Sequence, residues 1–101
     1  MEIVRYKSLQ EVPLHEILFA VTSEIDYEMD RLILLEHREN YETDFILIEG
    51  GHCSCYDFDE TEWEGLIMNE EELKKLLANV SEYQTLRMKL KDFLKYYKGI
   101  Y

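Results

Sequence analysis

The chain has 101 residues, of which 47% are hydrophobic and 33% are charged, and its formal net charge is −11. This length suits a single domain over residues 1–101, and the apolar content excludes a disordered chain. No apolar run approaches the roughly 20 residues that cross a bilayer, and residues 1–5 lack the pattern of a signal peptide, so we expect a cytoplasmic protein.

The acidic residues are concentrated in the middle of the chain. Residues 41–72 hold eleven acids and no base, whereas residues 73–101 hold two acids and seven bases. Such a negative field repels nucleic acid and anionic membranes, and it attracts basic proteins or cations. The sequence therefore predicts no direct nucleic-acid partner and no membrane partner.

The first part of the chain predicts one short helical turn followed by a strand. Ser8 and Glu11 have the spacing of a capping box, but Pro13 limits any helix that follows to about one turn. The apolar and partly β-branched run 17–22 predicts a first strand. Polar and apolar residues alternate after it, which indicates a strand with one solvated face that ends in a turn near residues 29–30.

Three further strands are predicted from the apolar runs that follow. The run 32–35 predicts a second strand that ends in a polar turn at residues 37–40, and the run 45–48 predicts a third. The paired glycines at 50–51 permit positive φ and predict a hairpin. Residues 52–58 would then form the fourth strand.

After Trp63 the pattern changes to that of helices. Asn69 is a good N-cap, and three glutamates follow it where the helix dipole favours negative charge. Apolar residues then recur at intervals of three and four over 73–80 and again over 83–97. The outer face of the second helix is expected to carry the basic residues Arg87, Lys91, Lys95 and Lys98.

The sequence thus predicts an α+β fold, with an antiparallel meander of three to four strands and two C-terminal helices packed on one face. Every residue of the run 32–35 is apolar, which indicates that both faces of the sheet are partly covered. A homodimer could supply the second cover.

Three soft metal ligands, His52, Cys53 and Cys55, lie within four residues. With Asp57 as an oxygen ligand they could bind zinc in a structural or a catalytic site. On a regular strand, however, His52 points away from both thiols, and no second pair of ligands follows. Reduced thiols and a histidine beside a hairpin, with no cofactor, are the alternative. Catalysis by a thiolate is disfavoured, because the surrounding carboxylates raise the pKa of a thiol.

The segment that follows the thiols alternates carboxylates with aromatic residues. Its candidate partner-binding residues are Tyr56, Asp57, Asp59, Glu60, Glu62, Trp63 and Glu64. The carboxylates could imitate a nucleic-acid backbone toward a basic protein, with the aromatic rings as anchors. A solvated acidic edge that prevents strand pairing is the alternative, as is a loose Mg²⁺ or Ca²⁺ site. An EF-hand loop is excluded, because its twelfth position, counted from Asp57, is Met68.

The segment Gly51-His52-Cys53-Ser54-Cys55-Tyr56, followed by Glu60 and Trp63, resembles a motif of small, largely uncharacterised proteins from bacteriophages and from phage-derived regions of bacterial genomes. Asp57 stands where that motif has glycine. The resemblance implies a phage or mobile-element origin and no particular activity.

These patterns lead to one preferred hypothesis and one alternative. The preferred hypothesis is a non-enzymatic, acidic binding module of phage type that docks on a basic surface of a host protein and blocks it in the host cytoplasm. The alternative is a zinc-binding protein that uses His52, Cys53, Cys55 and Asp57.

Overall fold

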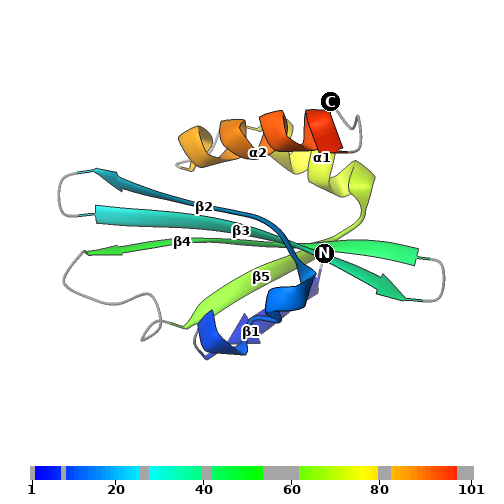
Figure 1. Ribbon diagram of the computed structural model, residues 1–101, viewed down its shortest axis with the longest axis horizontal. Helices are drawn as coiled ribbons and strands as arrows, with labels where there is room; N and C mark the ends of the chain where they lie inside the picture. Colours follow the sequence, from blue (N-terminus) through cyan, green and yellow to red (C-terminus); the bar gives the residue numbers. More distant parts are fainter. Residues whose placement is uncertain are drawn as a thin grey trace.

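The computed structural model describes residues 2–7, 9–25, 28–39, 42–53, 62–79 and 83–97. A five-stranded antiparallel sheet lies under two helices that cover one of its faces (Figure 1), and the strand order is β1-β5-β4-β3-β2. The strands are β1 (Glu2–Tyr6), β2 (Ile17–Ile25), β3 (Glu28–Glu39), β4 (Glu42–Cys53) and β5 (Trp63–Met68). The helices are α1 (Glu70–Ala78) and α2 (Gln84–Tyr97), and two short 3-10 turns, Leu9–Glu11 and Leu14–Glu16, join β1 to β2.

The predicted α+β class is confirmed, since β2, β3, β4 and β5 form an antiparallel meander of four successive neighbours. The fifth strand, β1, was not predicted. It pairs with β5 and forms the edge of the sheet opposite β2. The chain therefore crosses from one edge of the sheet to the other between β1 and β2, and the 3-10 turns lie on this crossing.

The predicted hairpin at residues 50–51 is wrong, because β4 continues straight through it. Gly50 lies opposite Arg31 and Gly51 lies opposite Asp30 in the ladder between β3 and β4. Residues 52 and 53 are thus the last two residues of β4 rather than the start of a fourth strand, and residues 54–58 lie outside the described part of the chain. The fourth strand of the meander is β5.

The turns predicted near residues 29–30 and at residues 37–40 are also wrong within the described part of the chain. Asp30 pairs with Ser23, and His37 pairs with Asp44, so β3 extends beyond its apolar centre in both directions. The ladder hydrogen bonds satisfy the backbone whatever the side chain is, so polar residues continue a strand wherever a neighbouring strand is present.

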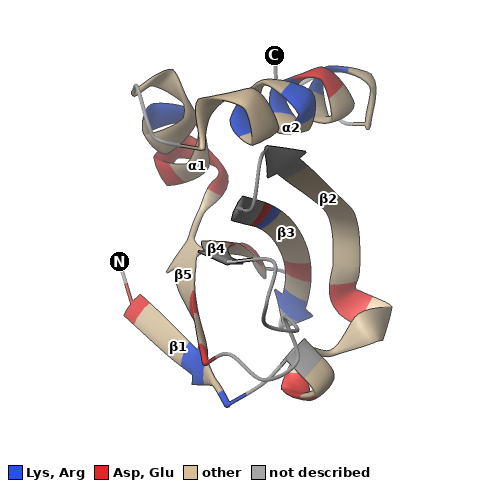
Figure 2. Ribbon diagram, turned by 90° about the vertical axis from the view of Figure 1, so that its left-hand side faces the viewer, with Lys and Arg blue, Asp and Glu red and all other residues tan. Residues whose placement is uncertain are grey.

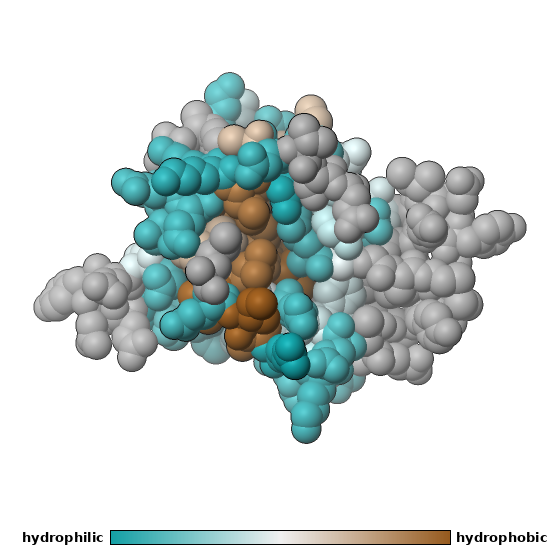
Figure 3. Space-filling model, turned by 180° about the vertical axis from the view of Figure 1, so that it is seen from behind, coloured by the Kyte–Doolittle hydropathy of each residue, from teal (hydrophilic) through white to brown (hydrophobic). Residues whose placement is uncertain are grey.

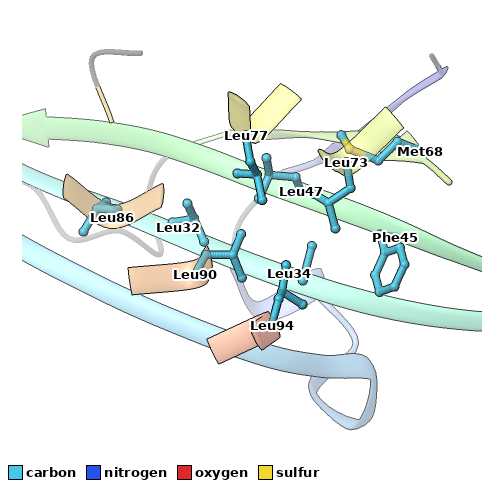
Figure 4. Packing of buried hydrophobic residues seen from close by; sticks show 10 residues of the cluster. All are labelled: Leu32, Leu34, Phe45, Leu47, Met68, Leu73, Leu77, Leu86, Leu90 and Leu94. Atoms are coloured by element: carbon cyan, nitrogen blue, oxygen red, sulfur yellow. The ribbon is translucent and has the colours of Figure 1, made fainter. Parts of the chain in front are cut away.

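The first core lies between the sheet and the helices (Figure 4). Leu32 and Leu34 of β3 face the leucines of α1 and α2, at the spacing that the helical pattern predicts. The members of this cluster are Leu32, Leu34, Phe45, Leu47, Met68, Leu73, Leu77, Leu86, Leu90 and Leu94. Phe93 of α2 stacks on Phe19 of β2, with ring centroids 5.1 Å apart, so α2 covers the β2 side of the sheet.

The second core lies on the opposite face of the sheet, to which Ile33 and Leu35 point. Its buried members are Tyr6, Val12, Ile33, Leu35, Ile48 and Trp63. The sheet is strongly curved, and the crossing segment with its 3-10 turns lies below it (Figure 2). The chain therefore supplies part of the second cover itself, and the homodimer that could also supply cover stays a prediction.

The start of α1 is confirmed at the residue that the sequence predicts. The side chain of Asn69 accepts a hydrogen bond from the backbone N–H of Glu72, and the Glu72 carboxylate accepts one from the backbone N–H of Asn69. This reciprocal capping box satisfies two of the N–H groups at the helix start. None of the helices in the described ranges is long and apolar enough to span a membrane.

Candidate functional site

The described part of the acidic segment contributes to a hollow at the end of the sheet, where β5 passes into α1. The hollow has a volume of about 350 Å³. Its lining residues are Glu2, Asp44, Ile67, Met68, Asn69 and Glu72. Three carboxylates thus meet there from three different elements, β1, β4 and α1.

Strand pairing and the helix cap bring these carboxylates together. Glu2 pairs with Ile67 across β1 and β5, and Phe45, the residue after Asp44, pairs with Met68 across β4 and β5. Glu72 is held at the hollow by its capping-box hydrogen bond to the N–H of Asn69, at 3.3 Å. The geometry of the hollow therefore depends on β5 and on its direct continuation into α1.

The hollow has a negative charge, and its accessible apolar contact comes from Ile67. Glu2 is exposed and Asp44 and Glu72 are half-buried, and no lysine or arginine is among the lining residues. Within the described residues, the side chains of Glu2 and Asp44 make no hydrogen bond or ion pair. Converging carboxylates attract a cationic group, and the half-buried Ile67 offers contact to an alkyl chain.

The structure describes three of the seven residues that the sequence proposed for partner binding. Glu62 precedes β5 and is exposed, and Glu64 of β5 is exposed and forms an ion pair with Arg5 at 3.5 Å. Trp63 is only 3% exposed and belongs to the second core. The other four, Tyr56, Asp57, Asp59 and Glu60, lie outside the described residues.

The burial of Trp63 explains why the glycine pair continues a strand. A Cβ atom placed on Gly50 would lie 2.3 Å from Cζ3 of the Trp63 ring, far closer than two carbon atoms approach. The missing side chain at Gly50 thus makes room for the indole against β4. Gly50, which directly precedes the motif, and Trp63 are therefore partners in packing rather than parts of a hairpin and an exposed anchor.

The proposed metal ligands lie at the boundary of what the structure describes. His52 and Cys53 are opposite Met29 and Glu28 in the β3–β4 ladder, and Cys55 and Asp57 lie outside the described residues. Among the side chains that the structure describes, no three of His, Cys, Asp or Glu are grouped as metal ligands. The zinc hypothesis stays a prediction from the sequence.

One prediction about the helices is wrong, since Arg87 is not on the outer face of α2. It is 7% exposed, and its guanidinium donates to both carboxylate oxygens of Glu49 on β4, at 2.6 and 2.7 Å, and to the carbonyl oxygen of Leu76, at 3.1 Å. The hydrogen bond from Arg87 to Glu49 raises the pKa of the guanidinium above its ordinary value. The spacing of Arg87 from Leu90 and Leu94 places all three on one helical stripe, a signal that could have revealed the position of Arg87.

Some acidic residues have cationic partners within the molecule and others do not. Glu49 pairs with Arg87 and Glu64 pairs with Arg5, whereas the carboxylates of the hollow have no cationic partner among the described residues. Lysine and arginine residues lie along α1 and α2 (Figure 2), and apolar surface forms one column on the face seen in Figure 3, bordered by hydrophilic side chains. The hollow is therefore the candidate site with the clearest unbalanced charge.

Comparisons of the chain with protein-family models, with curated proteins and with solved structures found no match in any of the three. The chemistry of the candidate site consequently rests on its own geometry.

Proposed function

We propose that this protein is a small acidic binding module that acts without catalysis, by docking on a basic surface of a host protein and blocking that surface. The observation that carries the proposal is the convergence of Glu2, Asp44 and Glu72 on one hollow with no basic residue in its lining. The hollow receives a lysine or arginine side chain of the partner.

Both parts of a lysine side chain match the hollow. The ammonium group is attracted by the three carboxylates, and the alkyl chain packs on Ile67. The wider acidic segment 41–72 adds long-range attraction, which speeds the encounter with a basic surface and favours basic over acidic partners. A partner surface that is covered in this way is unavailable to its own anionic ligand. The phage-type origin rests on the sequence resemblance alone.

The acids do not contribute equally to this proposal. Glu49 is buried in its pair with Arg87, and Glu64 is partly neutralised by Arg5. Docking therefore depends on the hollow and on exposed acids such as Glu62, rather than on the net charge as a whole.

Binding of a ten-residue lysine peptide to the ¹⁵N-labelled protein tests the proposal. We expect amide shifts at Asp44, Met68 and Glu72, and an affinity that falls as salt rises, because the attraction is screened. Asp44→Asn should weaken binding about threefold to tenfold. Asp92→Asn on the exposed surface of α2 removes the same charge elsewhere and serves as the matched control.

Two results would overturn the proposal. One is an affinity for the peptide that does not change with salt. The other is equal weakening by Asp44→Asn and Asp92→Asn, which would show that only net charge matters and that the hollow is not a site.

A further inference from the structure

The edge strand β2 presents a row of backbone groups to which no strand is paired among the described residues. It hydrogen-bonds to β3 on one side only, and it borders the sheet in Figure 1 and Figure 2. The ladder to β3 is regular over seven successive pairs, from Phe19 opposite Leu34 to Ile25 opposite Glu28. Every second residue of such a strand directs its N–H and C=O groups away from the sheet, where another strand can pair with them.

The other edge of the sheet, β1, has features that prevent strand pairing, whereas β2 has few of them. β1 has only five residues, and two of these, Glu2 and Arg5, are charged and exposed. In β2 the run 17–23 contains no charged residue, proline or glycine, and most of it is β-branched or aromatic. A bulge between Ile17 and Phe19 interrupts only one end of β2. β2 is therefore the edge that is suited to pairing.

Packing fixes the position of β2 on the side of the helices. Phe19 stacks on Phe93 of α2 with ring centroids 5.1 Å apart, and Val21 packs against the first core. Ala20 and Thr22, which alternate with them on the opposite face, are small and exposed. A strand that is already held in place, with small exposed side chains, can accept a second strand at little cost in conformational entropy.

Apolar surface adjoins this edge on the face turned away from the helices. Leu14, on the 3-10 turn that precedes β2, is 78% exposed. It contributes with Ile17 and Ala20 of β2 to the lining of a hollow of about 410 Å³. A chain that pairs with β2 would also remove part of this apolar surface from water, which is favourable in proportion to the area buried.

We infer that β2 pairs with β2 of a second copy of the chain, antiparallel and about a two-fold axis, so that two five-stranded sheets become continuous. An extended strand adds to an open edge through main-chain hydrogen bonds, and the neighbouring side chains decide which strand is accepted. The uncharged run 17–23 favours an uncharged strand over a basic or an acidic one. The run itself meets this requirement, and a two-fold axis lets the same surface serve both copies.

The sequence of β2 is complementary to itself when the pairing is centred on Val21. The large Phe19 of one copy then lies opposite the small Ser23 of the other, so two bulky residues do not meet. Glu24, the only charged residue of β2, lies near opposite ends of the paired strands in the two copies. The two-fold axis also places Leu14 of both copies on the same face of the joined sheet, where the two apolar surfaces adjoin.

Analytical ultracentrifugation of the full chain, from about 10 µM to about 500 µM, tests the inference over the range of weak to moderate dimers. We expect the molar mass to rise from that of one chain to that of two. The dimer should become tighter as salt is raised, because salt screens the repulsion between two chains of net charge −11. Lysine-peptide binding at the acidic hollow should have the opposite salt dependence, so this inference and the proposed function can fail independently.

Two pairs of variants test the contacts of the dimer. Ala20→Lys should raise its dissociation constant at least about tenfold, because a charge then lies between the paired strands. Ala78→Lys at the exposed end of α1 changes the net charge equally and should have no such effect. Leu14→Ser should weaken the dimer about threefold, whereas Met88→Ser, at another exposed apolar residue, should not. The serine pair decides the matter if Ala20→Lys unfolds.

Hydrogen exchange locates the interface. In concentrated protein, the amides of residues 19–23 that point away from β3 should exchange more slowly than in dilute protein, whereas the amides of β1 should exchange at the same rate. The inference is overturned if the chain stays monomeric over the whole concentration range, or if the dimer protects a different surface. It is also overturned if the two lysine variants, or the two serine variants, dimerise alike.

Discussion

Glu49 and Arg87 form an ion pair that is buried between the sheet and the helices, with only 10% and 8% of their side chains exposed. The guanidinium also donates to the carbonyl oxygen of Leu76, so this one side chain connects α2 to β4 and to α1. Charges held in this way must be paired, because each of them has lost its contact with water.

We predict that Glu49→Gln lowers the free energy of unfolding by about 3–5 kcal/mol, because it leaves the Arg87 cation buried without its counter-charge. Urea unfolding measures the change. Glu64→Gln is the matched control, since it removes the exposed partner of Arg5 and should cost at most about 1 kcal/mol. Equal losses in the two variants would contradict a special role for the buried pair.

Gly50→Ala should destabilise the protein by about 1–3 kcal/mol, because the added methyl group meets the Trp63 ring. Replacing Trp63 by leucine in the same chain should recover part of the loss due to Gly50→Ala. A double-mutant cycle over the two positions measures this coupling by urea unfolding. If the losses of unfolding free energy in the two single variants add up in the double variant, contact with Trp63 is not the reason that position 50 requires glycine.

The capping box should contribute measurably to α1. Asn69→Ala removes the acceptor for the Glu72 N–H and should cost about 1 kcal/mol in the free energy of unfolding, whereas Asn69→Ser keeps an acceptor and should cost less. Without this cap the first turn of α1, which carries Glu72, should be less well ordered. The alanine variant should therefore also bind the lysine peptide more weakly in the titration described above. An alanine variant as stable as the serine variant would argue against the cap.

Tyr6 should make the protein sensitive to alkali. Burial, and to a smaller extent the charge of Glu16, raise the pKa of Tyr6 above its ordinary value of 10.0. The folded state then holds this proton more tightly than the unfolded state, so the stabilisation is complete below about pH 10 and is lost as the pH rises through the folded pKa. The free energy of unfolding should fall above about pH 10.

Urea unfolding at pH 9 and at pH 11 tests this pH dependence. Tyr6→Phe should reduce the fall between the two pH values, whereas Tyr96→Phe, at a position 88% exposed, should not. A fall of the same size in the protein and in the Tyr6→Phe variant would exclude Tyr6 as its source.

The binding-module proposal expects no stoichiometric zinc in protein purified without chelators. Elemental analysis of the protein and of Cys53→Ser distinguishes this proposal from the zinc hypothesis. One zinc ion per chain that is lost in Cys53→Ser would favour the alternative in which His52, Cys53 and Cys55 bind metal.

The features that the sequence predicts correctly are those that short-range patterns determine. The run 32–35 is apolar at every position and lies between two cores, and the leucines of 73–77 and 86–94 face the sheet at helical spacing. Asn69 begins α1 because a cap needs only the residues beside it. These elements define the α+β class and the side on which the helices pack.

The remaining features depended on contacts between residues far apart in the chain. β1 and β5 are short and carry little periodic pattern, and they form strands because β1 pairs with β5 and β5 pairs with both β1 and β4. Gly50 continues β4 because the Trp63 ring packs on it. Arg87 faces the sheet because its guanidinium forms an ion pair with Glu49 of β4. Glu2, Asp44 and Glu72 surround one hollow only after β5 has brought their elements together. Periodicity specifies which side of an element is buried, but pairing and packing decide which distant residues share a site.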